Sequence, residues 1–218
     1  MLEEKLNELE EKLIEEASLA EDMVKKSIEG LTKKRKEILE KVIKEYEPKT
    51  NELEIKIDEF CTNLIALYQP KAGNLRTILM ILKMNNDLER IGDLAVNISE
   101  SALFLIEKPP VKPLIDIPRM AEESIDMLKN AINSFINKDA NLAKSVCEKD
   151  SVVDNLRDQI LRELITYMSS DPSTIERSIH LIRISRCLER IADLSTNICE
   201  DVIFMTEGRI IKHHKDGS

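Results

Sequence analysis

Paired carboxylates are the residues of this sequence whose type and spacing could do chemistry. Glu89 and Asp93 lie four positions apart in LERIGDLAVN, and Glu189 and Asp193 repeat that spacing one hundred positions later in LERIADLSTN. On a helix, residues four apart share a face, where like charges repel by roughly 0.2–0.5 kcal/mol per pair. A bound cation would turn that repulsion into coordination, and oxygen donors suit hard ions such as Mg²⁺, Mn²⁺ or iron.

A further pair precedes each of these along the chain. Asp150 and Asp154 are again four positions apart, and Glu47 and Asn51 occupy the matching places in the first half. There an amide replaces one carboxylate, and Pro48 costs a helix one hydrogen bond. Antiparallel neighbouring helices would bring two such pairs together around an ion. The sequence therefore predicts metal sites in both halves, with the second half the more complete.

The repeated segment carries other polar residues beside these pairs. At 100° per residue they fall on or beside the carboxylate face, which we expect to be exposed, opposite the apolar seam. We expect the two arginines to form ion pairs with the adjacent helix, with anion binding as the alternative. The candidate further ligands are Asn97, Glu100, Asn197 and Glu200, and the arginines are Arg90 and Arg190.

Long amphipathic helices are the elements that must position these residues. The apolar residues around Leu88 step by four and three, which predicts a seam that packs into a bundle. Four prolines between residues 109 and 118 exclude helix there. The expected helices cover residues 2–30, 33–67, 75–107, 119–136, 140–168 and 174–207, and the expected seam residues are Met84, Leu88, Ile91, Ala95, Ile98, Ala102 and Leu105.

Short connections between long helices predict antiparallel neighbours. The expected fold is therefore all-α, with two tandem, sequence-similar antiparallel three-helix bundles and six long helices related by internal duplication. The first bundle covers residues 1–108, a proline-rich linker residues 109–118, the second bundle residues 119–207, and a C-terminal tail residues 208–218. The His213 and His214 pair in that tail is interpreted as either inert or a weak metal site.

Composition excludes several classes of protein. The 218 residues are 42% hydrophobic, 33% charged and only 3% aromatic, which is typical of long helices. A net charge of -9 argues against a surface that follows a nucleic-acid backbone. No apolar run is long enough to span a membrane, and four cysteines without a CxxC pair favour a reducing compartment. We therefore expect a cytoplasmic protein.

The two repeated segments resemble a known family. NNDLERIGDLAVNISE (residues 85–100) and CLERIADLSTNICED (residues 187–201), each after a proline-marked loop, resemble the signature helices of the PhoU family of phosphate-transport regulators. The resemblance implies two similar three-helix bundles with E/DxxxD pairs that bind metal ions, often as multinuclear clusters. It also implies a cytoplasmic homodimer that links a phosphate ABC transporter ATPase subunit to a sensor histidine kinase and acts as a negative regulator of phosphate uptake and starvation signalling.

Carried onto this sequence, the metal-binding pattern falls on the paired residues described above. The resemblance leaves iron, manganese, magnesium and zinc as alternatives. A metal-free helical scaffold that binds partners through its acidic faces is the alternative function. A carboxylate metalloenzyme is disfavoured because no histidine follows a glutamate by three positions, the spacing used in di-iron bundles. The predicted metal ligands are Asp150, Asp154, Glu189, Asp193, Glu47, Asn51, Glu89 and Asp93.

Overall fold

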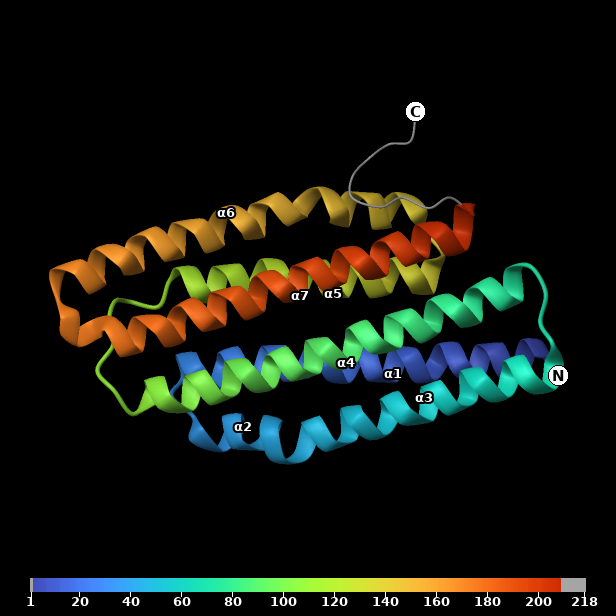
Figure 1. Ribbon diagram of the computed structural model, residues 1–218, viewed down its shortest axis with the longest axis horizontal. Helices are drawn as coiled ribbons and strands as arrows, with labels where there is room; N and C mark the ends of the chain where they lie inside the picture. Colours follow the sequence, from blue (N-terminus) through green and yellow to red (C-terminus); the bar gives the residue numbers. More distant parts are fainter. Residues whose placement is uncertain (1, 209–218) are drawn as a thin grey trace.

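Within residues 2–208 the protein folds into six long helices arranged as two three-helix bundles, and a π-helical turn divides the second of these helices into α2 and α3 (Figure 1). The structure is a computed structural model that describes residues 2–208, and this range contains no strand. The first bundle consists of α1 (Leu2–Thr32), α2 (Lys36–Lys41), a π-helical turn (Val42–Tyr46), α3 (Glu47–Tyr68) and α4 (Gly73–Ile106). The second consists of α5 (Asp116–Asn137), α6 (Ala140–Ser170), a short 3₁₀ turn (Pro172–Thr174) and α7 (Ile175–Glu207). The all-α, duplicated architecture predicted from sequence is confirmed. His213 and His214 lie outside the described residues.

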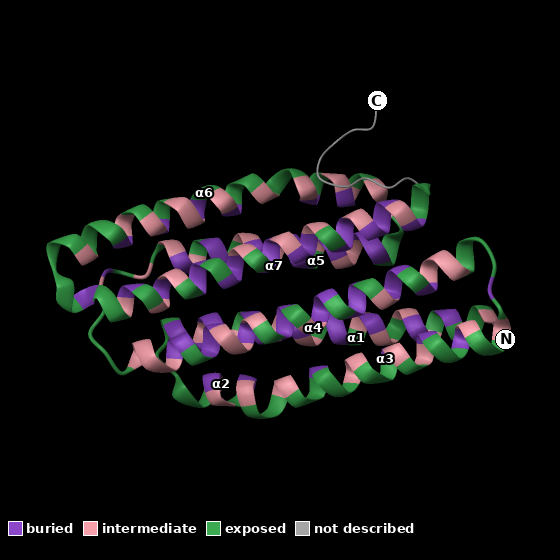
Figure 2. Cartoon of the chain, viewed as in Figure 1, coloured by how far each residue is buried: buried purple, intermediate pink, exposed green. Residues whose placement is uncertain are grey.

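The two bundles pack through their equivalent last helices. Figure 1 shows α6, α7, α4 and α3 side by side in that order, with α5 and α1 behind them. α4 and α7 run in opposite directions at the centre of the row. Figure 2 shows that the buried residues gather on the sides of these helices that face their neighbours. One hydrophobic core therefore extends through both bundles.

The apolar seam of α4 forms part of that core. Leu88 and Ile91 are completely buried, as are their counterparts Leu188 and Ile191 on α7. Burying a leucine side chain contributes about 1.5–3 kcal/mol. Of the predicted seam only Leu105 is half-buried, because it lies in the last turn of α4. The four-three spacing thus identified the core-facing side of both helices.

Pro48 marks the irregular part of the first bundle. The predicted single helix over residues 33–67 begins at Lys36 and contains a π-helical turn that ends two residues before Pro48. A proline ring has no N–H and collides with the carbonyl four residues earlier, so a wider turn at this point accommodates it. The expected disturbance by Pro48 is confirmed. α6, which has no proline inside it, continues without interruption.

Side-chain contacts fix the starts of the second-half helices. Asp139 caps α6 by accepting hydrogen bonds from the backbone N–H groups of Asn141 and Leu142, at 2.9 and 3.1 Å. In the linker, Lys112 is buried and donates to Asp116 at 2.6 Å and to Glu163 of α6. These contacts hold the start of α5 against α6, and α5 accordingly begins three residues earlier than expected.

Candidate functional site

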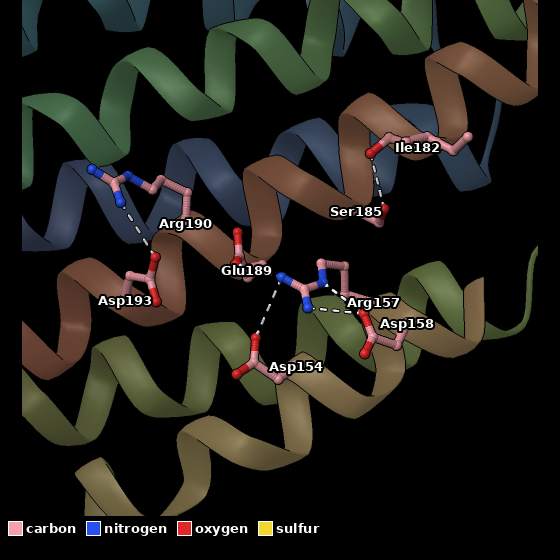
Figure 3. A network of polar contacts seen from close by, with 8 residues as sticks. All are labelled: Asp154, Arg157, Asp158, Ile182, Ser185, Glu189, Arg190 and Asp193. Carbon is pink, nitrogen blue, oxygen red and sulfur yellow. Dashed lines mark hydrogen bonds and ion pairs between the residues drawn. The ribbon is translucent and has the colours of Figure 1, made fainter. Parts of the chain in front are cut away.

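Two of the four carboxylates predicted on the second half, Asp154 of α6 and Glu189 of α7, meet between these helices (Figure 3). Arg157 on α6 lies at their centre, because its Nη1 atom is 2.8 Å from Glu189 Oε1 and 3.7 Å from Asp154 Oδ1. The Nη2 atom of the same side chain donates to Asp158 Oδ1 at 2.8 Å. The structure therefore brings Asp154 and Glu189 together around one guanidinium group.

The other two carboxylates predicted for this half lie beside the pair. Asp193 follows Glu189 by one helical turn, and its Oδ2 atom is 3.4 Å from Nη1 of Arg190. Asp154 is close enough to Asp193 to contribute to the raised pKa of the Asp193 carboxyl, although burial is the larger cause. Asp150 is half-buried one turn before Asp154 on α6. Asp150 and Asp193 thus lie one helical turn from Asp154 and Glu189, each along its own helix.

Burial and crowding make this group of carboxylates electrostatically unfavourable. Burial raises the pKa of Glu189, Asp193 raises it further, and Arg157 lowers it. A cation at this point therefore stabilises the ionised form. Within residues 2–208, no three acidic, histidine or cysteine side chains are arranged around a common point that could hold a metal ion. Arg157 supplies the positive charge here, so an ion could enter only after this side chain turned away.

The first-half pair has different neighbours. Glu89 is half-buried and Asp93 is exposed. Burial raises the pKa of Glu89, with Asp93 and then Glu54 of α3 as further causes. Glu47 is half-buried beside the π-helical turn and Asn51 is exposed, and within the described chain neither forms a hydrogen bond or ion pair with the α4 pair. On α3, the residue whose charge raises the pKa of Glu89 is therefore Glu54 and not Glu47.

Four carboxylates inside the first bundle form a group that the sequence analysis missed. This acidic core cluster consists of Glu16 from α1, Glu54 and Asp58 from α3, and Glu89 from α4. Glu16 is 0% exposed, and neither of its carboxylate oxygens has a hydrogen-bond partner. Burial, followed by the charges of the other three, raises the pKa of Glu16 to about 9. Glu16 is therefore protonated at neutral pH.

Asn85 adds an amide to the acidic core cluster. Its Nδ2 atom donates to Asp58 Oδ1 at 2.7 Å and to the backbone carbonyl of Glu54 at 3.0 Å. Its Oδ1 atom is buried without a partner. Because an unpaired buried polar atom costs about 1–3 kcal/mol, this part of the first bundle is a local source of instability.

Two signals in the sequence could have identified the cluster. Glu16 follows Leu13 by three positions and precedes Ala20 by four, so it occupies a position of the α1 seam. Glu54 and Asp58 are four positions apart on α3, as closely spaced as the pairs that were identified. A buried glutamate is rare enough that composition alone gives no reason to expect one.

The candidate further ligands on α4 both contact Arg183 of α7. The Asn97 Oδ1 atom accepts a hydrogen bond from Arg183 Nη2 at 2.7 Å, and Glu100 lies 3.5 Å from the same guanidinium. The expectation that this whole face is exposed holds for Asp93 and Glu100 but not for the half-buried Asn97. Glu89, Glu189 and Asp193 are half-buried as well. On α7, Asn197 is exposed and Glu200 is half-buried.

The two predicted ion-pairing arginines bind carboxylates of their own helices. Arg90 lies 3.8 Å from Asp87 on α4, and Arg190 lies 3.4 Å from Asp193 on α7. The expectation of pairs with an adjacent helix is wrong, because both side chains are more than half exposed, at 56% and 58%, on the outer flank. Arg157, which sequence reasoning missed, makes the contact between helices instead.

Comparison with known proteins places both bundles in one family. The model of the PhoU domain matches residues 13–102 and 117–202, one match in each half. The chain belongs to the PhoU family. The resemblance inferred from the two signature helices is confirmed, and each PhoU domain contains one copy of the repeated carboxylate pair.

The PhoU relatives cover nearly the whole chain. A protein of Aquifex aeolicus named phosphate-specific transport system accessory protein PhoU homolog is 44% identical over 95% of this chain and 94% of its own length. A second PhoU homolog, from Thermotoga maritima, is 32% identical over 99% of this chain and 92% of its own. These relatives are named as accessory proteins, which confirms the prediction that a PhoU-family chain of this kind is not an enzyme.

Solved PhoU structures share the fold. The crystal structure of PhoU from Pseudomonas aeruginosa superposes with a TM-score of 0.92 at 33% identity, covering 96% of this chain and all of that one. The phosphate transport system regulatory protein PhoU from Streptococcus pneumoniae gives 0.90 at 26% identity, covering 98% and 100%. Among the described residues, no helix is both long and apolar enough to cross a membrane.

Proposed function

We propose that this protein is a negative regulator of phosphate uptake and of phosphate-starvation signalling. The observation that carries the proposal is the similarity over nearly the whole chain to relatives named as accessory proteins of phosphate-specific transport. Both halves match the family, so the proposal does not depend on a fragment of the relatives.

The regulator acts as a cytoplasmic adaptor between the ATPase subunit of a phosphate ABC transporter and a sensor histidine kinase, and it functions as a homodimer. The internal difference between the bundles supports two partners. Asn86 of α4 and Arg186 of α7 occupy matching exposed positions and differ in charge, so the two halves present different surfaces. A chain with two unlike faces can hold two partners at once.

Metal binding is the second part of the proposal. Asp150, Asp154, Glu189 and Asp193 supply oxygen donors that fit a hard ion, and burial makes a cation favourable there. The ion would replace the positive charge that Arg157 supplies. Iron, manganese, magnesium and zinc all remain compatible with such donors. The first-half set of Glu47, Asn51, Glu89 and Asp93 is less complete, with Asn97, Glu100, Asn197 and Glu200 as further donors around the two sites.

A metal-free adaptor is the second candidate, and Arg157 is the observation that favours it. Its guanidinium already compensates Glu189 and Asp154 at 2.8 and 3.7 Å. In that case the acidic faces bind basic surfaces of the partners directly. The two candidates differ in whether substitution of Asp154 and Glu189 acts through lost metal.

Deletion of the gene in the source organism tests the regulatory role. Expression of a phosphate-repressed reporter should rise in high phosphate, and the wild-type gene should restore repression. Unchanged reporter expression in the deletion strain would reject the regulatory proposal.

Complementation then separates the two candidates. A gene carrying Asp154→Asn and Glu189→Gln should fail to restore repression, with the metal content of the purified variant as the second readout. Loss of repression with lost metal supports the metal-binding adaptor. If the purified wild-type protein contains no metal and the variant still fails to restore repression, the result supports the metal-free adaptor.

A further inference from the structure

A groove of about 550 Å³ lies on α7 where α6 and α4 approach it. Four of the chain's eleven arginines line this arginine groove, namely Arg157, Arg183, Arg186 and Arg190. Volumes of this size are within the range of small-molecule sites. The concentration of positive side chains is unusual for a chain whose net charge is -9.

Helix geometry explains why these side chains meet. Arg183, Arg186 and Arg190 are separated by three and four positions, so they share one face of α7. Arg157 reaches the same groove from α6, and Leu94 of α4 contributes an apolar part of the lining. The arginines thus come from two helices that pack against each other.

The positive charge in the groove is only partly compensated. Asp158 and Glu189 are the two carboxylates in the lining, and Arg157 already contacts both. Arg186 is exposed and has no ion pair with any residue in the range 2–208. Arg183 is 48% exposed and lies 3.5 Å from Glu100, so its contact is open to competition.

The first half lacks the corresponding set of arginines. One hundred positions earlier, α4 carries Lys83, Asn86 and Arg90, so one cation is replaced by an amide. Arg157 is matched by Glu54 on α3, which reverses the charge at that position. The arginine groove is therefore a specialisation of the second half and does not follow from the duplicated fold.

We propose that the arginine groove binds a phosphate group, with Arg183 and Arg186 as its principal contacts and Arg157 at its edge. A guanidinium offers two parallel N–H donors that match two oxygens of a phosphate, and several around one dianion hold it more strongly than single charges do. The ligand is either inorganic phosphate or a phosphate carried on a nucleotide. This site goes beyond the proposed regulatory function and requires no bound metal.

Equilibrium dialysis of the full chain with radiolabelled inorganic phosphate tests the proposal. The protein is first treated with a chelator, so that phosphate cannot bind through a metal ion. Chloride at matched ionic strength controls for general screening. We expect saturable binding at about millimolar phosphate or tighter. A parallel titration with ATP identifies the source: tighter binding of ATP assigns a nucleotide, whereas equal or weaker binding assigns the free ion.

Variants that copy the first half connect binding to the groove. Arg186→Asn reproduces Asn86, and it should weaken phosphate or ATP binding about tenfold or more, because a hydrogen bond to a charged group is lost. Arg162→Asn, at an exposed arginine of α6 that does not line the groove, is the matched control and should leave the affinity unchanged. Circular dichroism confirms folding, which an exposed substitution should not affect.

Three results would overturn the proposal. One is the absence of saturable binding by wild-type protein with either ligand. Another is equal affinity of Arg186→Asn and wild type. The last is an equal loss in Arg162→Asn, which would show general attraction to positive charge. None of these results bears on the reporter experiment, so the regulatory function and the phosphate site can fail separately.

Discussion

The two halves of the molecule share a bundle but differ in the charges inside it. Glu16 of α1 lies at the position that Met120 occupies in α5, and both side chains are completely buried. Glu54 of α3 lies where α6 has Arg157. The same three-helix framework thus encloses a group of carboxylates in one half and an apolar side chain with an ion pair in the other.

Burial supports these matches. Ala17 and Ala121, which directly follow Glu16 and Met120, are both buried. On the middle helices, Ile57 and Ile160 are both completely buried, three residues after Glu54 and Arg157.

The two halves accommodate the repeated glutamate, Glu89 or Glu189, in different ways. Glu189 ionises beside Arg157, 2.8 Å away. Glu89 instead faces Glu54 and Glu16, so the first half must retain a proton that the second half does not need. The bundles are therefore expected to respond differently to pH and to charge substitutions, and similarly to changes in their common core.

The largest effect should be the same in both halves. Leu88→Ala and Leu188→Ala each remove a completely buried side chain from equivalent seams. Each should lower the free energy of unfolding by about 3–4 kcal/mol, through lost burial and the cavity left behind. Urea denaturation of both variants measures this. A difference of more than about 2 kcal/mol between them would contradict an equivalent core.

The next effect should occur in the first half alone. Glu16→Met copies Met120 and removes a buried carboxyl that must stay protonated. The pKa of Glu16 is raised by folding to about 9 from 4.5. Its contribution is most favourable at acid pH and is lost by about 1.4 kcal/mol per pH unit as pH rises toward 9. The pH-dependent part of the variant's gain over wild type should therefore be about 3 kcal/mol at pH 7 and should disappear near pH 4.5.

Urea denaturation at pH 5 and pH 8 measures that gain. Glu15→Met, at the exposed neighbouring position, is the control and should show no such dependence on pH. A gain in Glu16→Met that is equal at both pH values would show that Glu16 does not titrate as described.

A smaller effect of opposite sign is expected in the second half. Arg157→Gln removes the cation beside Glu189 and should lower stability by about 1 kcal/mol at pH 7. Folding raises the pKa of Glu189, and loss of Arg157 raises it further, so the loss should shrink when Glu189 is protonated near pH 4. Thermal denaturation at both pH values measures this. Equal losses would assign the effect of Arg157 to packing rather than to charge.

The last effect, no larger than that of Arg157→Gln, concerns the start of the middle helix. Asp139 caps α6 with two hydrogen bonds, whereas Arg35 at the start of α2 makes no side-chain cap. Asp139→Ala should therefore cost about 1 kcal/mol, and Arg35→Ala less than about 0.5 kcal/mol. Urea denaturation of the pair provides the comparison, and a larger cost for Arg35→Ala would show that the caps do not distinguish the halves.

The helical spacing of apolar residues was sufficient to predict the fold from the sequence. The seam around Leu88 and Leu188 repeats at helical spacing, so the buried face of each last helix follows from the spacing of its apolar residues. Proline positions likewise predicted the linker and the disturbed helix near Pro48, because proline removes a backbone N–H and disrupts a helix at its own position. Such local rules do not depend on which helix packs where.

Contacts between helices were harder to predict. Glu16 satisfies the spacing of the α1 seam, but a charged residue type argues for exposure unless its surroundings are known. Arg157 is recognisable only when α6 and α7 are placed together, because its partner Glu189 is 32 residues away. The pairing of Asn97 with Arg183 likewise depends on how the two bundles dock.

The central claim is that the two halves have the same bundle fold but differ in their carboxylate sites. Metal titration of chelator-treated protein tests this claim most directly. Manganese affinity is measured for wild type, for the second-half variant Asp154→Asn with Glu189→Gln, and for the first-half variant Glu89→Gln with Asp93→Asn. The account predicts that the second-half variant weakens the tightest binding by about tenfold or more, while the first-half variant changes it less. Equal losses in the two variants, or no metal bound by the wild type, would contradict it.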